Sequence, residues 1–201
     1  MQVRWMAGVL SAALGMAVMV VPVNLRAADS PATASASAPA SKPSVGSTAK
    51  DFTLKTLEDR EVQLTALLKD GPVVVLMLRG WVGYQCPICN QQVGEFISNA
   101  KALTATGARV VMVYPGPEDT VKAKAKEFIT GKTLPENFYF LIDPSLKTIV
   151  DYGIRWSAPN ENSYPSTFVI DKEGKFQFVK ISNSHGGRAT AKEVLAVLEK
   201  K

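Results

Sequence analysis

The chain has 201 residues, 46% of them hydrophobic, which is enough to bury the core of one ordinary domain. Its formal net charge of +5 falls to +3 if Arg4 and Arg26 leave with an N-terminal segment, because 21 basic and 18 acidic residues then remain. A charge this small and dispersed excludes a nucleic-acid partner. The densest basic run, Lys122, Lys124 and Lys126, alternates with alanines and predicts a solvated helix face.

Residues 1–28 have the pattern of a secretory signal peptide. Arg4 precedes an uncharged, mostly apolar run from Trp5 to Leu25, and Ala27 and Ala28 supply small residues for an imperfect cleavage box. The run is also long enough to cross a bilayer, for which about 20 residues suffice, so an uncleaved membrane anchor is the alternative. Both readings predict export, to a bacterial periplasm.

Residues 29–47 are rich in Ala, Ser and Pro and predict a flexible linker, followed by one domain over 48–201. The elements expected first are a hairpin of strands 52–54 and 62–64, a continuously apolar strand at 73–78, a helix over 87–105, a strand at 110–114 and a helix over 118–130. Those expected next are a strand at 138–142, a short helix with Asp143 as N-cap and Pro144 at its first position, a hairpin of strands 167–170 and 176–178, and a last helix opened by a capping box of Thr190 and Glu193.

This order of elements predicts an α/β fold. Alternating units require parallel strands with right-handed crossovers, and the closing hairpin adds antiparallel strands to a mixed central sheet flanked by helices. The hairpin over 52–64 is then an N-terminal extension. Ligands of such sheets bind beyond the carboxyl ends of the parallel strands, and Cys86 is expected at that edge.

Cys86 and Cys89 are the two cysteines of the chain and form a Cys-Pro-Ile-Cys sequence between a strand and a helix. A thiol at a helix start lies near unsatisfied backbone N–H groups and the positive end of the helix dipole, both of which favour the thiolate. Such placement lowers a cysteine pKa from about 8.5 to roughly 3.5–7.5. Because the thiolate is the nucleophile of disulfide exchange, the pattern predicts a redox-active pair.

Helical spacing separates the roles of the two sulfurs. Cys89 belongs to an apolar stripe that is expected to be buried. The other members of the stripe are Val93, Phe96, Ile97, Ala100 and Leu103. Cys86 lies one turn earlier at the helix tip, where we expect it to be accessible. We therefore predict that Cys86 is the attacking thiol and Cys89 the resolving thiol.

Other chemistries of the pair are weaker or excluded. A purely structural disulfide is the main alternative, although closing so short a loop contributes only about 2 kcal/mol. A closed zinc site needs four ligands, which two cysteines and one histidine cannot supply. Covalent haem attachment needs Cys-x-x-Cys-His, and Asn90 follows Cys89. Because no dinucleotide fingerprint is evident, we expect no cofactor and electrons from a protein or small thiol.

These motifs resemble the thioredoxin-like superfamily. The resemblance rests on the Cys-Pro-Ile-Cys sequence after a buried strand and on the segment 164–171, Tyr-Pro-Ser-Thr-Phe-Val-Ile-Asp. The segment 46–54 looks like the start of the redoxin branch, which includes alkyl hydroperoxide reductase/thiol-specific antioxidant peroxiredoxins and exported thioredoxin-like reductases. The resemblance covers residues 46–200 and implies a thioredoxin-like fold.

The resemblance further implies that Pro165 is a cis-proline facing the cysteine pair, with the backbone of Tyr164 aimed at substrate; a trans proline at a strand start is the alternative. Peroxiredoxins carry Pro-x-x-x-Thr/Ser-x-x-Cys around their reactive cysteine. Here Arg79 replaces the proline and Gly83 replaces the hydroxyl residue that would hydrogen-bond peroxide. This departure argues against efficient peroxide reduction, with Tyr84 as a candidate substitute donor.

Topology predicts that the loop 183–188 returns to the cysteine pair. His185, the only histidine, is a candidate proton shuttle or thiolate partner, with an idle loop residue as the alternative. Arg79, Arg155 and Arg188 are candidates to stabilise the thiolate, with ordinary ion pairs as the alternative. The aromatic residues that are candidates to line the approach are Trp81, Tyr84 and Trp156, with core or surface packing as the alternative.

Three functions follow from these features. The first is an exported thiol–disulfide oxidoreductase in which a mixed disulfide on Cys86 is resolved by Cys89, with a protein or small-molecule disulfide or thiol as partner. The second is a peroxiredoxin-like peroxidase that passes through a Cys86 sulfenic acid. The third is a non-enzymatic binding module. A membrane is expected as a partner only through an uncleaved anchor.

Overall fold

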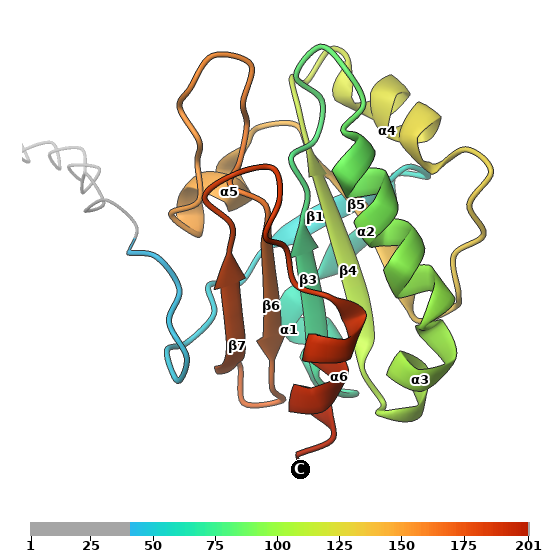
Figure 1. The fold of residues 1–201 in the computed structure, drawn as a ribbon, viewed down its shortest axis with the longest axis vertical. Coiled ribbons are helices and arrows are strands. Elements are labelled where there is room, and N and C mark those ends of the chain that lie inside the picture. Colours follow the sequence, from blue (N-terminus) through green and yellow to red (C-terminus); the bar gives the residue numbers. More distant parts are fainter. Residues whose placement is uncertain (1–40, 201) are drawn as a thin grey trace, which may run out of the picture. The chain divides into compact units, whose positions relative to one another are not determined.

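The computed structural model describes residues 41–200 (Figure 1). Its strands are β1 (Thr53–Thr56), β2 (Glu61–Gln63), β3 (Val73–Met77), β4 (Arg109–Pro115), β5 (Phe138–Asp143), β6 (Ser166–Ile170) and β7 (Phe176–Ile181). Its helices are α1 (Leu64–Leu68), α2 (Pro87–Ser98), α3 (Ala100–Ala105), α4 (Val121–Ile129), α5 (Lys147–Asp151) and α6 (Ala191–Leu198). The predicted signal or anchor segment and most of the predicted linker lie outside the described residues.

The strands form one mixed sheet in the order β2-β1-β5-β4-β3-β6-β7. β3, β4 and β5 are parallel, whereas β6 and β7 form the antiparallel closing hairpin and β1 joins the sheet antiparallel to β5. Met77, at the end of β3, pairs with Val113 of β4 and with Ser166 of β6. The loop that leads to Cys86 therefore leaves the sheet between the end of β4 and the start of β6.

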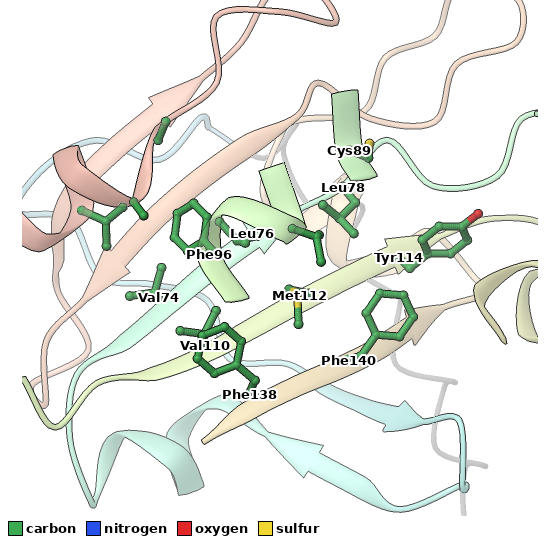
Figure 2. Close-up of a cluster of buried hydrophobic side chains, with 14 of the residues drawn as sticks. Val74, Leu76, Leu78, Cys89, Phe96, Val110, Met112, Tyr114, Phe138 and Phe140 are labelled. Carbon is green, nitrogen blue, oxygen red and sulfur yellow. The ribbon is translucent and has the colours of Figure 1, made fainter. Parts of the chain in front are cut away.

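Helices cover both faces of this sheet, which confirms the predicted α/β class. α2, α3, α4 and α6 pack on one face, where Val74 and Leu76 of β3 meet Phe96 of α2 (Figure 2). α1 and α5 lie on the opposite face, where Val75 of β3 meets Ile149 of α5. Because β3 is buried on both faces, it has the continuous apolar sequence from which it was predicted.

The single helix predicted over 87–105 is wrong, because it is interrupted at Asn99. Asn99 has φ −98° and ψ 12°, and α3 starts after it. Its side-chain amide donates to the Glu95 carbonyl at 2.8 Å, a local bond by which asparagine competes with helical backbone pairing. Phe96 and Leu103 are both fully buried, so the apolar spacing continues across the break and hides it from a periodicity argument.

Helix α1 was not predicted, and Leu64 opens it instead of ending a strand. The Asp51 carboxylate accepts the Thr65 backbone N–H at 3.0 Å and so satisfies a donor of its first turn. α4 also begins three residues later than predicted, at Val121. Leu64 is buried in the structure. A buried leucine at this position suits the end of a strand as well as the start of a helix, so the apolar pattern of so short a segment does not distinguish the two.

Two helix caps test the remaining predictions. Asp143 is not the N-cap of α5, a position held by Leu146 at φ 56°. Its carboxylate instead accepts the backbone N–H groups of Thr148 and Ile149 at 3.0 and 3.3 Å, so it still satisfies the helix start, from the end of β5. The capping box that opens α6 is confirmed, with Thr190 and Glu193 bonded reciprocally.

Residues 46–49 are attached to the start of β7. The Gly46 backbone N–H donates to the Phe176 carbonyl at 2.8 Å, and the Phe176 N–H donates to the Ser47 carbonyl at 3.0 Å.

Within residues 41–200, no helix combines the length and the apolar sequence needed to cross a bilayer.

Candidate active site

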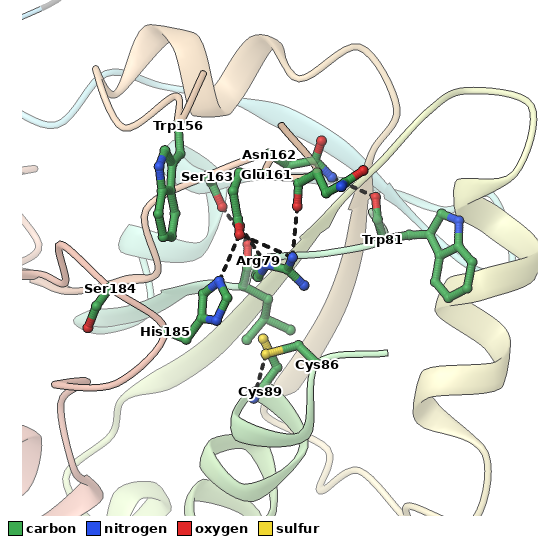
Figure 3. A network of polar contacts seen from close by, with 12 residues as sticks. Arg79, Trp81, Cys86, Cys89, Trp156, Glu161, Asn162, Ser163, Ser184 and His185 are labelled. Atoms are coloured by element: carbon green, nitrogen blue, oxygen red, sulfur yellow. Dashed lines mark hydrogen bonds and ion pairs between the residues drawn. The ribbon is translucent and has the colours of Figure 1, made fainter. Parts of the chain in front are cut away.

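Cys86 is the N-cap residue of α2, and Pro87 occupies the first helical position. The cysteine reaches this place through a loop of irregular backbone that follows the carboxyl end of β3. The Cys89 backbone N–H donates to Cys86 Sγ at 3.4 Å, as a capped helix start provides (Figure 3). The sulfur therefore lies where helix geometry stabilises negative charge.

Both sulfurs are covered, and the expectation of an accessible Cys86 is wrong for this structure. Cys86 is 4% exposed and Cys89 is 1% exposed. Cys86 packs in the apolar cluster on the α2 face of the sheet, and the segment between β7 and α6 places the Arg188 guanidinium against its sulfur, with Nη2 at 3.6 Å. Spacing along the helix cannot reveal contacts that come from the sheet and from another loop.

The two thiols have opposite proton affinities. The hydrogen bond from the Cys89 side chain lowers the pKa of Cys86 to about 5, helped by the Cys89 backbone N–H and the charges of Arg188 and Arg79 and opposed by burial. The same bond between the side chains, together with burial, raises the pKa of Cys89 well above its ordinary value. At neutral pH the pair is a thiolate at residue 86 beside a thiol at residue 89.

We expect alkylation of the reduced protein by iodoacetamide to titrate at Cys86 with a midpoint near pH 5, because the rate follows the thiolate fraction. Cys89 should remain unmodified through neutral pH. Mass spectrometry of the quenched protein assigns the modified residue at each pH. A midpoint of about 8.5, the value of a free cysteine, would contradict the ionised state described above.

Arg79 follows β3 closely and is 1% exposed. Its Nε and Nη2 donate to the two Glu161 carboxylate oxygens at 2.6 and 3.2 Å, and Nη2 also donates to the Asn160 carbonyl at 2.7 Å. Nη1 has no hydrogen-bond partner among the described residues. Figure 3 shows the guanidinium between Glu161 and the cysteine pair. Arg79 therefore contributes positive charge to Cys86 while its own charge is paired.

His185 has a defined partner. Its Nε2 lies 2.8 Å from Glu161 Oε1, and its side chain is 38% exposed. Burial works against ionisation of Glu161, but the hydrogen bonds from Arg79 and His185 hold the pKa of this carboxyl below its ordinary value. The structure thus joins His185 to Arg79 through one carboxylate, although it shows no bond between His185 and either sulfur (Figure 3).

The implied cis-proline at Pro165 is wrong, since every peptide bond that the structure describes is trans. Pro165 enters β6 directly, and its carbonyl accepts the Ser182 N–H at 2.9 Å, an extended arrangement that the trans isomer suits. The Tyr164 backbone is already bonded, its N–H to the Ile154 carbonyl at 2.9 Å and its carbonyl to the Ser166 hydroxyl at 2.8 Å. It is not free to pair with a substrate chain.

The other candidates do not touch the sulfurs by hydrogen bond. Arg155 Nη1 donates to the carbonyls of Glu161 and Asn162 at 2.7 and 2.6 Å and so braces their loop. Tyr84 is 46% exposed, with its ring 4.5 Å from the Arg79 guanidinium. The remaining aromatic candidates are Trp156 and Trp81. The Trp156 ring stacks on the Tyr164 ring with 4.8 Å between ring centroids, and its centroid lies 5.4 Å from that of His185. The Trp81 ring centroid lies 4.7 Å from Lys124 Nζ.

The sequence matches the AhpC/TSA family over residues 45–179. The chain belongs to this family. It is 31% identical to the chloroplastic peroxiredoxin Q of Sedum lineare over 134 residues, which are 67% of each chain. It is 32% identical to the thiol-disulfide oxidoreductase ResA of Geobacillus thermodenitrificans, over 65% of this chain and 66% of that one.

Solved structures show the same fold. Peroxidoxin BcpB from Mycobacterium tuberculosis superimposes with a TM-score of 0.64 at 24% identity, over 78% of this chain and 97% of that one. A peroxiredoxin-like protein from Aquifex aeolicus also gives 0.64, at 20% identity, over 81% of this chain and 90% of that one. The predicted redoxin branch and thioredoxin-like fold are confirmed. So is the class of activity, a thiol-dependent oxidoreductase of thioredoxin-like or peroxiredoxin-like type.

Two residues of this AhpC/TSA-family site were missed by the sequence analysis. Glu161 lies in an irregular loop without periodicity, so nothing in the sequence marks it as the partner of Arg79. Gln92 did carry a signal: it lies three residues after Cys89 and one before Val93, on the buried side of α2. A polar residue within an apolar stripe needs an internal partner, and Gln92 contacts Arg188.

Proposed function

We propose that this chain is an exported thiol–disulfide oxidoreductase with Cys86 as nucleophile and Cys89 as resolving thiol. The observation that carries the proposal is the divergence of the two sulfurs, one ionised at the N-terminus of α2 and the other protonated beneath it. Two thiols whose pKa values are shifted in opposite directions suit two successive exchange steps, because the thiolate makes the first attack and the protonated thiol reacts only afterwards.

In the first step the Cys86 thiolate attacks one sulfur of a partner disulfide. An S–S bond forms to Cys86, and the partner's other sulfur leaves as a thiolate. Cys89 then loses its proton and attacks Cys86 Sγ, which releases the second partner sulfur and leaves a Cys86–Cys89 disulfide. Two electrons pass from the chain to the partner. The reverse sequence oxidises a partner dithiol, and the partner's potential decides the direction.

Access to Cys86 requires a local opening, because the sulfur is 4% exposed. The segment between β7 and α6 lies over this sulfur through Arg188, whose Nη2 is 3.6 Å from Cys86 Sγ. We infer that the partner is a protein or small-molecule disulfide or thiol that displaces this segment. The apolar run from Trp5 to Leu25, which we predict to be a signal peptide or an anchor, supports our proposal of a place in the bacterial periplasm, where such pairs exchange with redox partners.

Peroxide reduction is the second candidate, and the peroxiredoxin Q relatives favour it. In that reaction the Cys86 thiolate attacks the O–O bond, water or an alcohol leaves, and the sulfenic acid condenses with Cys89 to a disulfide and water. Against it stands Gly83, which offers no hydroxyl where the peroxiredoxin pattern has Thr or Ser. The confirmed enzyme class argues against the non-enzymatic binding module.

A side-by-side assay of the domain over residues 41–201 separates the two reactions. The protein is first reduced with the same reductant for both assays. We expect it to be oxidised faster by a protein disulfide than by hydrogen peroxide when each oxidation is followed by stopped-flow fluorescence. The tryptophan Trp156, beside Tyr164 and His185, supplies a reporter near the site. Faster oxidation by peroxide would overturn the first candidate in favour of the second.

A further inference from the structure

Gln92 connects three segments beneath the site. It is 6% exposed on α2. Its Nε2 donates to the Ala189 carbonyl at 3.1 Å and to Thr167 Oγ1 at 3.3 Å, and its Oε1 accepts Arg188 Nη1 at 3.1 Å. A buried amide with all these partners is a rigid link between the helix that carries Cys86 and the segment that covers it.

The chemistry of these partners determines the orientation of the amide. The Ala189 carbonyl can only accept a hydrogen bond, and the Arg188 guanidinium can only donate. A flipped amide would place oxygen against oxygen on one side and N–H against N–H on the other. Gln92 therefore presents its oxygen to Arg188. Rotating the amide by 180° would replace the hydrogen bonds to Arg188 and to the Ala189 carbonyl with two repulsive contacts.

Arg188 is held on three sides. Its Nε donates to the His185 carbonyl at 2.9 Å, its Nη1 donates to Gln92, and its Nη2 is directed at Cys86 Sγ at 3.6 Å. Because a guanidinium is planar, fixing Nε and Nη1 determines where Nη2 points. We propose that Gln92 is a positioning residue, whose side-chain oxygen holds the Arg188 guanidinium against the sulfur of Cys86.

This proposal rests on the proposed function only in taking Cys86 as the reacting sulfur. The other ionisable side chains around Cys86 are Arg79, which is paired with Glu161, and His185, which also contacts Glu161. Gln92 has no hydrogen bond to any of these three residues. A change at Gln92 should therefore reach Cys86 through Arg188 alone, which makes the link testable by a double-mutant cycle.

The test measures iodoacetamide alkylation of Cys86 across pH in the full chain. Gln92→Met removes the acceptor for Arg188 at similar volume. Each rate is divided by the rate of the same variant at high pH, where Cys86 is fully ionised, so that a change in access to the sulfur cancels. On this scale we expect about two- to tenfold slower alkylation near pH 5, the value expected if one hydrogen bond to the guanidinium is lost. Gln92→Glu should slow it further, since a carboxylate competes with the thiolate for Arg188. Gln91→Met, the same change at an exposed neighbouring position, should leave the rate unaltered.

The decisive comparison repeats Gln92→Met in an Arg188→Met background, where we expect no additional slowing. A purely structural role would lower the thermal midpoint without moving the alkylation profile, and that result in both Gln92 variants would overturn the proposal. The proposal would also be overturned if Gln92→Met slowed alkylation of Cys86 equally in the wild-type and in the Arg188→Met background. The isosteric Gln92→Glu keeps the test valid if the methionine variant does not fold. Because the alkylation profile needs no turnover, failure here is distinguishable from failure of the proposed function.

Discussion

Cys86→Ser is expected to abolish turnover with disulfide and with peroxide, by about 10³-fold or more. A serine hydroxyl at this position stays protonated, whereas the cysteine is ionised through hydrogen bonds from Cys89 and the charges of Arg188 and Arg79. Cys89 cannot take over the attack, because it is 1% exposed and its pKa is raised. Both reactions described above therefore begin with an attack by the Cys86 sulfur.

The measurement is single-turnover oxidation together with steady-state turnover of the same preparation. Far-UV circular dichroism and the thermal midpoint establish that the serine variant is folded, which a near-isosteric change at a helix cap should allow. Loss of both the first exchange and the complete cycle is the expected pattern. Near-normal turnover of Cys86→Ser would show that another group is the nucleophile.

The cysteine pair could be predicted from sequence because its signals are local. Cys86 is found at the helix start, and Cys89 lies on the buried stripe, both from spacing and from the strand that precedes them. β3 was predictable for the same reason, as a continuous apolar run bounded by Gly and Pro. These features depend on neighbours within one or two turns, where periodicity is informative.

The surroundings of the sulfur could not be predicted in this way. Arg188 contacts Cys86 from 102 positions along the chain, and only the topology of the closing hairpin predicted that its loop returns to the cysteine pair. Glu161 contacts Arg79 from 82 positions away, and nothing in the sequence predicted this pair. Such contacts depend on how long loops fold over the sheet edge, which no local pattern encodes. The accessible Cys86 was inferred from helical spacing alone, which does not include the packing of other segments on the sulfur. The cis bond at Pro165 was implied by the resemblance, and the hydrogen bonds that hold this residue in an extended strand could not be read from the sequence.

Cys89→Ser is expected to stop the cycle after its first step. With a disulfide substrate the variant should accumulate a mixed disulfide on Cys86, and with peroxide a persistent sulfenic acid, because neither can be resolved without the second thiol. Steady-state turnover should fall by about 10²-fold or more, while the first exchange stays rapid. Intact-mass spectrometry of the quenched reaction identifies the trapped species, and full turnover without one would contradict the resolving role.

Cys89→Ala is the matched control for the second task of this residue. The hydrogen bond from the Cys89 side chain is the largest cause of the lowered Cys86 pKa. A serine hydroxyl can still donate such a bond and an alanine cannot. We therefore expect the Cys86 alkylation midpoint to rise in Cys89→Ala and to stay lower in Cys89→Ser. Equal midpoints in the two variants would mean that Arg188, Arg79 and the helix terminus are sufficient to ionise Cys86. Cys89 would then serve only to resolve the mixed disulfide.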